Sequence, residues 1–255
     1  MAIKSIAEQT YVPDELLIIQ DGPVGGAIET VIRHWELAYP GQFRTHTIET
    51  NQGLGNALRV GVAESSHEMI ARMDSDDIAV SDRIERQRTF LQSNPEIDIV
   101  GGYLVEFADD PESPYAVRQV PESHEAIERL ARFRSPMNHA TVLFRRSAVI
   151  EAGNYRAVDH MEDYDLWVRM LQANKRFANI PEVLLKMRAG TAMYSRRRGL
   201  SYLRREIEQQ VDWYEQGFIN SPRLCLNLCM RVGIRCVPSV LQKRVYGRYR
   251  QDVPV

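Results

Sequence analysis

The chain has 255 residues, of which 44% are hydrophobic and 26% are charged, so it has the composition of a globular protein with a buried core. Its 32 basic and 34 acidic side chains give a formal net charge of -2, which gives no reason to expect a nucleic-acid partner. No apolar run approaches the roughly 20 residues that a membrane-spanning helix requires.

The first part of the chain alternates short apolar runs with segments of helical periodicity. We expect strands at residues 15–20, 45–49, 68–73 and 97–100, with helices around residues 28–35 and 58–62 between them. Strands and helices that alternate at such short separations imply right-handed crossovers. The predicted fold class is therefore α/β, with a Rossmann-like, mostly parallel sheet flanked by helices.

The next helix is expected to begin near Asp82, whose side chain can cap it, with Glu85 placed to complete a capping box. It should end before residues 94–95, an Asn-Pro pair. Beyond the glycines at residues 101–102 the alternation loosens. In this second part we expect a polar loop at residues 109–123, helices at residues 122–133 and 147–152, a strand at residues 141–144, and a helix that begins at Glu162.

Acidic side chains follow two of the predicted strands: Asp21 follows the first, and Asp74, Asp76 and Asp77 follow the third. Ligands bind outside the carboxyl ends of strands in open α/β sheets, so we expect Asp21 and Asp74 to end neighbouring strands and to face one crevice. Carboxylates this close together repel one another unless a positive charge lies among them. Mg²⁺ or Mn²⁺, which accepts carboxylate and phosphate oxygens as ligands, is the simplest candidate, and a solvated turn is the alternative.

Two of the acidic segments are open to two interpretations each. The Asp21 carboxylate can accept hydrogen bonds from a nucleotide base or a ribose hydroxyl, whereas an Asp-Gly pair also simply forms turns. Glu162 and Asp163 stand at the start of a predicted helix, where acids stabilise the helix dipole. A carboxylate there can instead act as a general base that takes the proton from an attacking sugar hydroxyl.

Several segments together resemble the motifs of the large family two of inverting, nucleotide-sugar-dependent glycosyltransferases, which adopt the GT-A fold. They are the opening residues 5–11 with the strand and turn at residues 15–22, the loop at residues 51–57, the Asp-x-Asp segment at residues 71–77 and the Glu-Asp segment at residues 162–167. Their order and spacing match those of the family over roughly residues 1–190. The similarity points to bacterial enzymes that build capsular polysaccharide, exopolysaccharide and O-antigen units.

This resemblance implies roles for individual residues. Asp163 would be the catalytic base, and Glu162 would support it or position the acceptor. Asp76, with Asp77, would bind the divalent cation, Mn²⁺ or Mg²⁺, that bridges the diphosphate. The remaining implied positions are Asp21, Asn51, Arg72, Asp74 and Arg188 for the nucleotide-sugar, and His139 for the acceptor.

The chain departs from the family pattern in two places. Gln20 stands where the family often has the first of two acids, although a glutamine can still hydrogen-bond a base or a ribose. The family also begins with an apolar strand upstream of the helix that holds residues 5–9, and this sequence lacks that strand. We therefore expect the sheet to be one strand short beside residues 16–19, which would expose strand edges and weaken nucleotide binding.

The last third of the chain is rich in basic residues. Arg188 and the three arginines at residues 196–198 fit either a clamp on a diphosphate or a solvated basic face of a helix. The tail at residues 222–249 mixes apolar and basic side chains, which suits an anionic membrane surface or packing on its own domain. We expect a catalytic domain at residues 1–190 and a helical, basic C-terminal extension at residues 191–255.

The three cysteines, Cys225, Cys229 and Cys236, form no closed disulfide set because their number is odd. We expect them to be small apolar residues on helices. This cysteine usage favours the cytoplasm, and a peripheral position on the inner face of the plasma membrane is the open alternative.

Three functions compete. The favoured function is hexosyl transfer from a nucleotide-sugar, above all a UDP-sugar, to a saccharide or lipid-linked acceptor with inversion, in bacterial surface polysaccharide biosynthesis. The alternative is a truncated, catalytically impaired GT-A domain that only binds nucleotide or a partner. A nucleotidyltransferase also uses a parallel sheet and metal-binding acids, but it would usually need a glycine-rich phosphate loop after its first strand, and the sequence has none.

Overall fold

The computed structural model describes residues 1–158, 160–189, 200–236 and 251–252 of the chain. The helices are α1 (Ala2–Ala7), α2 (Gly26–Ala38), α3 (Leu54–Glu64), α4 (Arg83–Ser93), α5 (His124–Ala131), the 3₁₀ turn η1 (His139–Thr141), α6 (Arg146–Glu151), α7 (Glu162–Gln172), α9 (Leu200–Glu215) and α10 (Ser221–Cys236). The strands are β1 (Leu16–Asp21), β2 (Phe43–Ile48), β3 (Met69–Ala71), β4 (Ile78–Ala79), β5 (Ile99–Phe107), β6 (Ala116–Arg118), β7 (Leu143–Arg145), β8 (Phe177–Arg188) and β9 (Gln251–Asp252).

The described strands form two sheets. β1 and β2 form a parallel pair, and the larger sheet has the order β3-β7-β5-β6-β9, with β8 paired to both β5 and β4. In the larger sheet β5 and β8 run parallel, whereas the other described pairs are antiparallel. The α/β class is confirmed, but the expectation of a mostly parallel sheet is wrong there. The physical reason is that β7 inserts between β3 and β5, antiparallel to both.

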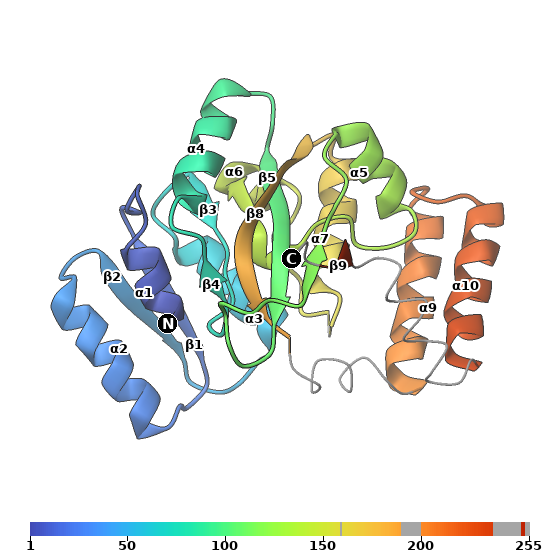
Figure 1. Ribbon diagram of the computed structural model, residues 1–255. Helices are drawn as coiled ribbons and strands as arrows, with labels where there is room; N and C mark the ends of the chain where they lie inside the picture. Colours follow the sequence, from blue (N-terminus) through green and yellow to red (C-terminus); the bar gives the residue numbers. More distant parts are fainter. Residues whose placement is uncertain (159, 190–199, 237–250, 253–255) are drawn as a thin grey trace.

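The two acid-bearing strands are not neighbours. β1 pairs with β2 and β3 pairs with β7, so the prediction that Asp21 and Asp74 end adjacent strands of one sheet is wrong. Figure 1 shows α1, α2, β1 and β2 together on one side of the larger sheet. All six residues of β1 are half-buried and α2 has no buried residue, so this N-terminal layer is the less buried part of the fold.

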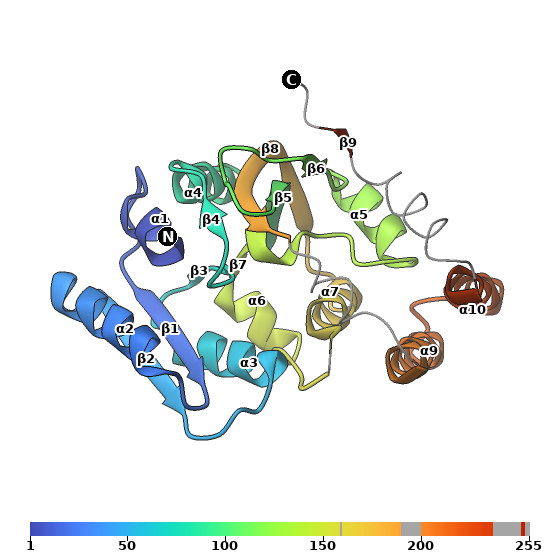
Figure 2. The same ribbon diagram turned by 60° about the horizontal axis from the view of Figure 1, so that its bottom comes forward.

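The main core lies between the larger sheet and α3, α6 and α7, which Figure 2 shows together on one side of the strands. Its members from these elements include Val62 of α3, Val149 of α6, Trp167 of α7 and Phe177 of β8. Burying such large apolar side chains contributes about 1.5–3 kcal/mol each, so this packing holds α7 firmly on the sheet. The start of α7 is thereby fixed relative to β3, which leads into the Asp74–Asp77 acids.

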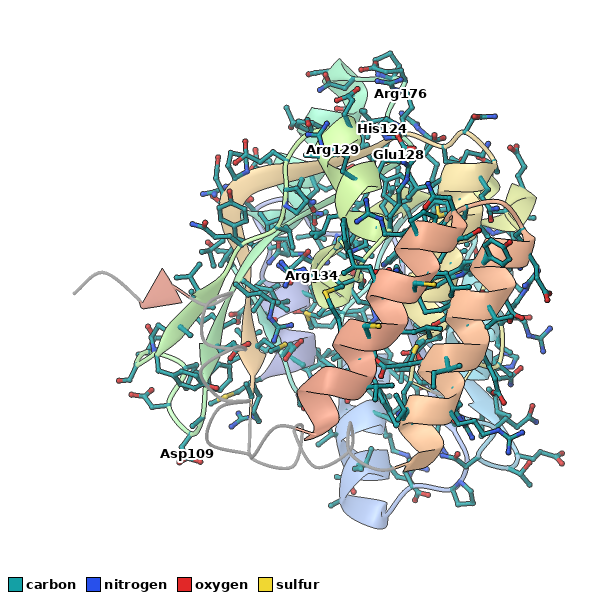
Figure 3. All side chains as sticks on the ribbon, turned by 90° about the vertical axis from the view of Figure 1, so that its right-hand side faces the viewer. Asp109, His124, Glu128, Arg129, Arg134 and Arg176 are labelled. Atoms are coloured by element: carbon teal, nitrogen blue, oxygen red, sulfur yellow. The ribbon has the colours of Figure 1, made fainter. Side chains whose placement is uncertain are left out.

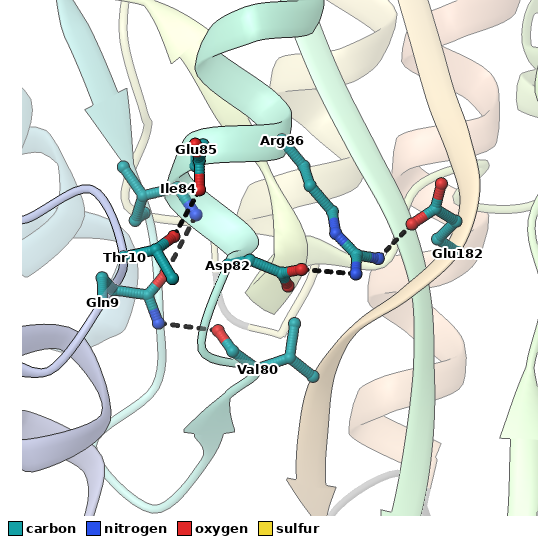
Figure 4. Close-up of polar contacts among 8 residues, drawn as sticks. All are labelled: Gln9, Thr10, Val80, Asp82, Ile84, Glu85, Arg86 and Glu182. Atoms are coloured by element: carbon teal, nitrogen blue, oxygen red, sulfur yellow. Dashed lines mark hydrogen bonds and ion pairs between the residues drawn. The ribbon is translucent and has the colours of Figure 1, made fainter.

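The N-terminus of α4 lies where the sequence predicts it, but the predicted capping box does not form. The Asp82 carboxylate instead accepts a hydrogen bond from Arg86 at 2.5 Å, and Arg86 also pairs with Glu182 of β8 (Figure 4). The Glu85 carboxylate accepts a hydrogen bond from the Thr10 hydroxyl at 2.6 Å. Asp82 is thus paired within its own helix and Glu85 with a distant residue, so neither carboxylate caps the helix start.

Gln9 takes over the capping. Its side-chain oxygen accepts a hydrogen bond from the backbone N–H of Ile84 at 3.0 Å, and its Nε2 donates to the carbonyl of Val80 at 2.6 Å (Figure 4). This satisfies one of the free N–H groups that every helix start presents. It also ties the segment after α1 to α4.

The longest strand, β8, was not predicted, because Pro181 and the exposed Glu182 interrupt its apolar pattern. It lies parallel to β5, and the register shifts after Gly102. A Cβ on Gly102 would lie 2.5 Å from the Cδ1 of Leu184, so any other residue there would force this leucine side chain to shift. The two glycines predicted to follow a strand therefore lie inside β5.

The C-terminal helices pack on α7 and α5. A second cluster joins Tyr164 and Val168 of α7 to Trp213 of α9 and to Ile219. Cys225 and Cys229 are exposed free thiols on α10. Among the described residues, no helix is both long enough and apolar enough to cross a membrane. The arginines at residues 196–198 and the tail beyond residue 236, apart from β9, lie outside the described residues.

Candidate active site

A buried ion pair lies just beyond the end of β3. The Nη1 and Nη2 atoms of Arg72 donate to the two carboxylate oxygens of Asp74 at 2.7 and 2.6 Å. Burial lowers the pKa of Arg72, but the charge of Asp74 and these hydrogen bonds outweigh it, so the net pKa is raised and the guanidinium stays charged. Such bidentate Arg–carboxylate pairs fix geometry as well as charge.

A second arginine supports the first, and the sequence analysis did not identify it. Arg83 at the start of α4 is fully buried, and its Nη2 donates to the carbonyl of Arg72 at 2.7 Å. Burial, together with the charge of Arg72, lowers the pKa of Arg83 to about 9. The local sequence gives no sign of this role, because an arginine in the first turn of a helix is usually exposed to solvent.

The Asp-x-Asp segment divides into an exposed and a buried carboxylate. Asp76 is exposed, whereas Asp77 is 1% exposed and its Oδ1 accepts a hydrogen bond from the backbone N–H of Arg188 at 3.0 Å. Burial, with the nearby charges of Asp74 and Asp76, raises the pKa of Asp77 to about 7. Its second oxygen, Oδ2, has no hydrogen-bond partner in the part of the chain that the structure describes.

These carboxylates fit a hard divalent cation. An orphaned buried oxygen and a carboxyl group with a raised pKa both indicate negative charge that a cation would neutralise. Within the described ranges, no three His, Cys, Asp or Glu side chains come close enough to hold a metal by themselves. Mg²⁺ and related ions commonly bind through one or two carboxylates and complete their shell with substrate phosphates and water, which suits this pair.

The start of α7 presents two adjacent acids in different surroundings. Glu162 is 7% exposed, whereas Asp163 is half-buried. Burial and the charge of Asp163 raise the pKa of Glu162 to about 7. The Ser135 hydroxyl donates a hydrogen bond to Asp163 at 3.2 Å, and this contact was also not foreseen. The sequence pattern gives no local sign of this contact, because Ser135 lies 28 positions before Asp163.

Arg72 brings the two acidic groups into one electrostatic centre. Its charge acts on Asp163 as well as on Asp74, and it also moderates the raised pKa of Glu162. The charge of Asp74 acts on Glu162 in the opposite direction. The end of β3 and the start of α7 are therefore close enough for their charges to interact, and the charge of Arg72 acts on both.

His139, predicted to contact the acceptor, is half-buried in η1, and its Nε2 lies 2.9 Å from the hydroxyl of Tyr155. Desolvation and the charge of Arg72 hold the pKa of His139 well below its ordinary value, so the ring is neutral. Tyr155 is 1% exposed, and burial raises the pKa of its hydroxyl. His139 and Tyr155 are thus two neutral side chains near the charges of Arg72 and its acidic partners.

Asp21, the last residue of β1, is hydrogen-bonded to the loop at residues 51–53 that precedes α3. The two Asp21 carboxylate oxygens accept hydrogen bonds from the backbone N–H groups of Gln52 and Gly53, each at 2.8 Å. Asn51 donates from Nδ2 to the Asp21 carbonyl at 3.1 Å. Both residues thus shape this loop, and direct contact with a nucleotide stays a prediction.

Arg188 ends β8 beside the Asp-x-Asp segment. Its backbone N–H is the group that holds Asp77, while its guanidinium lies over the ring of Phe107 at 4.8 Å from the centroid. One of its nitrogens, Nη1, donates to the carbonyl of Ala108 at 3.2 Å. The predicted contact between this side chain and a diphosphate stays a prediction.

Residues 1–153 match the family described as "Glycosyl transferase family 2". The chain belongs to glycosyltransferase family 2. This family 2 glycosyltransferase is 34% identical over 252 residues to the "Amylovoran biosynthesis glycosyltransferase AmsE" of Erwinia amylovora, covering 98% of this chain and 92% of that protein. It is 32% identical over 247 residues to the Escherichia coli "UDP-Gal:alpha-D-GlcNAc-diphosphoundecaprenol beta-1,3-galactosyltransferase", covering 97% of this chain and 89% of that protein.

Solved structures confirm the GT-A fold of this family 2 glycosyltransferase. S. aureus TarS 1-349 in complex with UDP-GlcNAc superposes with a TM-score of 0.65 at 15% identity, over 91% of this chain and 66% of that one. The mannosyltransferase PcManGT from Pyrobaculum calidifontis, in complex with GDP-Man and Mn²⁺, gives a TM-score of 0.60 at 14% identity, over 89% of this chain and 64% of that one. At such identities the likeness concerns the fold alone.

Proposed function

We propose that this protein is an inverting hexosyltransferase that transfers a sugar from a UDP-sugar to a saccharide or lipid-linked acceptor. The observation that carries the proposal is the guanidinium of Arg72, which is hydrogen-bonded to Asp74 on the motif that would hold the donor. Its charge also interacts with Asp163, which would act on the acceptor. A transferase must hold the donor and the acceptor hydroxyl at one reacting carbon. A charge that interacts with both acidic groups is consistent with donor and acceptor being held close together.

Inversion requires one displacement at the anomeric carbon. The acceptor hydroxyl attacks this carbon, its C–O bond forms as the bond to the diphosphate breaks, and a base takes the hydroxyl proton. Asp163 suits the role of base because it is the less buried of the two acids. Glu162, with its pKa of about 7, is partly protonated at neutral pH and is better suited to position the acceptor.

The donor would lie between the loop at residues 51–53 and the Asp74–Asp77 segment. Asp21 holds the loop through two backbone N–H groups, and Arg72 fixes Asp74 where it can meet a ribose. Asp76 and Asp77 would hold Mn²⁺ or Mg²⁺, which supplies Lewis-acid stabilisation of the departing diphosphate when bound. The solved neighbour PcManGT contains Mn²⁺ with its nucleotide-sugar, which supports a metal here by analogy of fold.

The relatives support a place in surface polysaccharide biosynthesis. One is named for amylovoran biosynthesis, and another for transfer of galactose to a GlcNAc-diphosphoundecaprenol acceptor. We extend the class of these acceptors, a sugar linked through a diphosphate to a lipid, to this chain. Such an acceptor lies in a membrane, so the enzyme would work in the cytoplasm against the inner face of the plasma membrane.

Helix α10 supports this peripheral position. Its exposed side chains include Leu226, Met230 and Val232, at 47%, 38% and 43% exposure. The helix sequence holds three arginines and no acidic residue. Exposed apolar side chains favour a lipid surface, and the absence of acidic residues from this helix avoids repulsion by anionic lipid. Flotation with vesicles that contain phosphatidylglycerol should recover the protein, and vesicles of phosphatidylcholine alone should recover less.

The decisive experiment measures UDP release from a panel of UDP-sugars, with Mn²⁺, in the presence of a short-chain alkyl diphosphate-linked GlcNAc. Proton NMR of the product then gives the anomeric configuration, and inversion is expected. The competing function is a GT-A domain that binds nucleotide without turnover. Saturable UDP binding with no transfer from any donor would favour that function.

A further inference from the structure

A polar pocket lies between the segment at residues 156–158 and helices α7 and α9. Its volume of ≈ 370 Å³ falls within the range of about 300–1,000 Å³ that is typical of small-molecule sites. Figure 2 shows α7 and α9 close to each other, and Figure 3 views the molecule from the side that carries α9 and α10. Its charged and polar lining includes Arg156, Asp165, Arg205, Glu208, Gln209 and Asp212.

The decisive residue in this pocket is Gln209 of α9. It is 7% exposed, yet neither its Nε2 nor its Oε1 has a hydrogen-bond partner among the described residues. Leaving buried polar groups unpaired destabilises the folded protein. The next residue, Gln210, is also buried, but its Oε1 accepts a hydrogen bond from Asn227 at 2.6 Å. Gln209 is therefore an exception within its own helix.

The unpaired amide needs a ligand that both donates and accepts hydrogen bonds. A primary amide offers two N–H donors and a carbonyl acceptor, and vicinal hydroxyl groups can satisfy both ends at once. A cation would leave the N–H groups unpaired, and a phosphate would leave the carbonyl unpaired. The amide itself thus selects a neutral, hydroxyl-rich ligand.

The charges around the pocket agree with that selection. The lining contains two arginines and three carboxylates, so both signs of charge are present. Two of the carboxylates are also already paired: Asp165 accepts from Arg169 at 2.9 and 2.8 Å, and Glu208 accepts from Arg204 at 2.7 Å. Positive and negative side chains both line the pocket, and this combination does not favour a strongly charged ligand.

The pocket is linked to the proposed active site along two segments of the chain. Asp165 follows the proposed base, Asp163, by two residues in α7. On the other side, the segment at residues 156–158 packs closely against the start of α3. A Cβ on Gly55 would lie only 2.3 Å from the carbonyl oxygen of Arg156. The pocket is thus one loop away from the proposed donor site.

We propose that this pocket binds a sugar unit of the acceptor, with the Gln209 amide as its recognition group. That the sugar belongs to the acceptor rests on the proposed function, whereas the binding of a sugar is argued from the pocket alone. The family match ends at residue 153, so α9 and its glutamine lie outside the matched segment. The pocket would then contribute to acceptor choice within this chain's own branch of the family.

The test uses the full ¹⁵N-labelled chain and three probes, D-glucose, D-galactose and N-acetylglucosamine. The Gln209 side-chain amide signal is assigned by its loss in Gln209→Leu. At least one probe should shift this signal in a saturable way, as followed by NMR. Another amide of the pocket lining, Gln216, should respond with it. The same probe should bind about tenfold more weakly or worse to Gln209→Leu and to Asp212→Asn, which corresponds to losing about 1.4 kcal/mol or more.

Two controls keep this test interpretable. Glu215→Gln changes an exposed residue of α9 outside the pocket lining and should leave sugar binding unchanged. Gln209→Leu should melt no lower than the wild type, because an apolar side chain removes the cost of the unpaired amide. UDP affinity with Mn²⁺, measured by calorimetry on each variant, tests the donor site separately.

The outcomes separate the two proposals. If no probe shifts the Gln209 signal, or if Gln209→Leu binds sugar as well as the wild type, the pocket proposal is overturned even when UDP binding is intact. If a probe shifts the signal and UDP does not bind, the sugar site stands and the proposed transferase function fails.

Discussion

Arg72 and Asp74, two positions apart beyond the end of β3, form a bidentate ion pair with N–O distances of 2.7 and 2.6 Å. The arginine is 8% exposed, and the side chain of Asp74 is 40% exposed. A buried guanidinium that loses its partner carries an uncompensated charge, and so does the partner when the guanidinium is removed. This relationship makes Arg72 a test of both stability and function.

Arg72→Leu should therefore destabilise the protein by about 3 kcal/mol, at the lower end for buried pairs because Asp74 keeps part of its hydration. Arg72→Lys should cost less, since it keeps the charge but not the two parallel hydrogen bonds. Urea denaturation followed by circular dichroism measures both. Arg204→Leu, at a side chain that is 82% exposed, is the control and should change stability little. Equal losses at the two arginines would contradict the structural role of Arg72.

Asp163→Asn should leave UDP affinity near that of the wild type and lower the transfer rate by about 10²–10⁴-fold, the usual contribution of a general base. Asparagine keeps the shape of the side chain and can still accept the Ser135 hydrogen bond, so the fold should be unchanged. UDP release with saturating acceptor gives the rate. Turnover within a few fold of the wild type would transfer the role of base to Glu162 or to another residue.

Asp76→Asn and Asp77→Asn should each weaken Mn²⁺-dependent binding of UDP, because each removes a carboxylate from the proposed cation site. The binding of UDP without metal should change much less. Isothermal titration with and without Mn²⁺ distinguishes the two. Asp14→Asn, an exposed acid far along the chain from this segment, serves as the matched control. Metal-dependent affinity that survives both substitutions would remove these residues from the site.

The local elements of this fold were largely predictable, because apolar runs and helical periodicity are local signals. The strand before Asp21 and the helix that begins at Glu162 both lie where the pattern places them. The order of strands was not predictable in the same way. β7 inserts between β3 and β5 from a distant part of the chain, and β8 carries Pro181 within its length. Such pairings depend on tertiary packing, which a single sequence does not display.

The candidate site shows the same division. The acids were visible because carboxylates at strand ends and helix starts form short motifs. Arg83, Tyr155 and Gln209 were not visible, because their importance comes from burial and from partners far away in the sequence. In the sequence, a buried arginine or an unpaired glutamine cannot be distinguished from the same residue on the surface.

Glu162 provides a prediction about pH. Its pKa of about 7 in the folded protein lies above the ordinary value of 4.5, so the folded state holds a proton that the unfolded chain releases between these two values. The stabilisation that this carboxyl group contributes is therefore fully present below about pH 4.5 and is lost as the pH rises through about 7. Glu162→Gln cannot ionise and should escape this loss.

At pH 8 the ligand-free Glu162→Gln variant should thus be more stable than the wild type by on the order of 1–3 kcal/mol, since one pKa unit corresponds to about 1.4 kcal/mol. Each kcal/mol raises the melting temperature by about 2–4 °C at this chain length. At pH 5 the difference should be much smaller, because Glu162 is then mostly neutral in the folded protein and the pH is only about half a unit above its ordinary pKa of 4.5. Differential scanning fluorimetry between pH 5 and pH 8 follows the divergence, with the exposed Glu96→Gln as control. A stability difference that does not change with pH would mean that the charge of Glu162 is compensated in the folded protein, and that its burial does not disfavour ionisation.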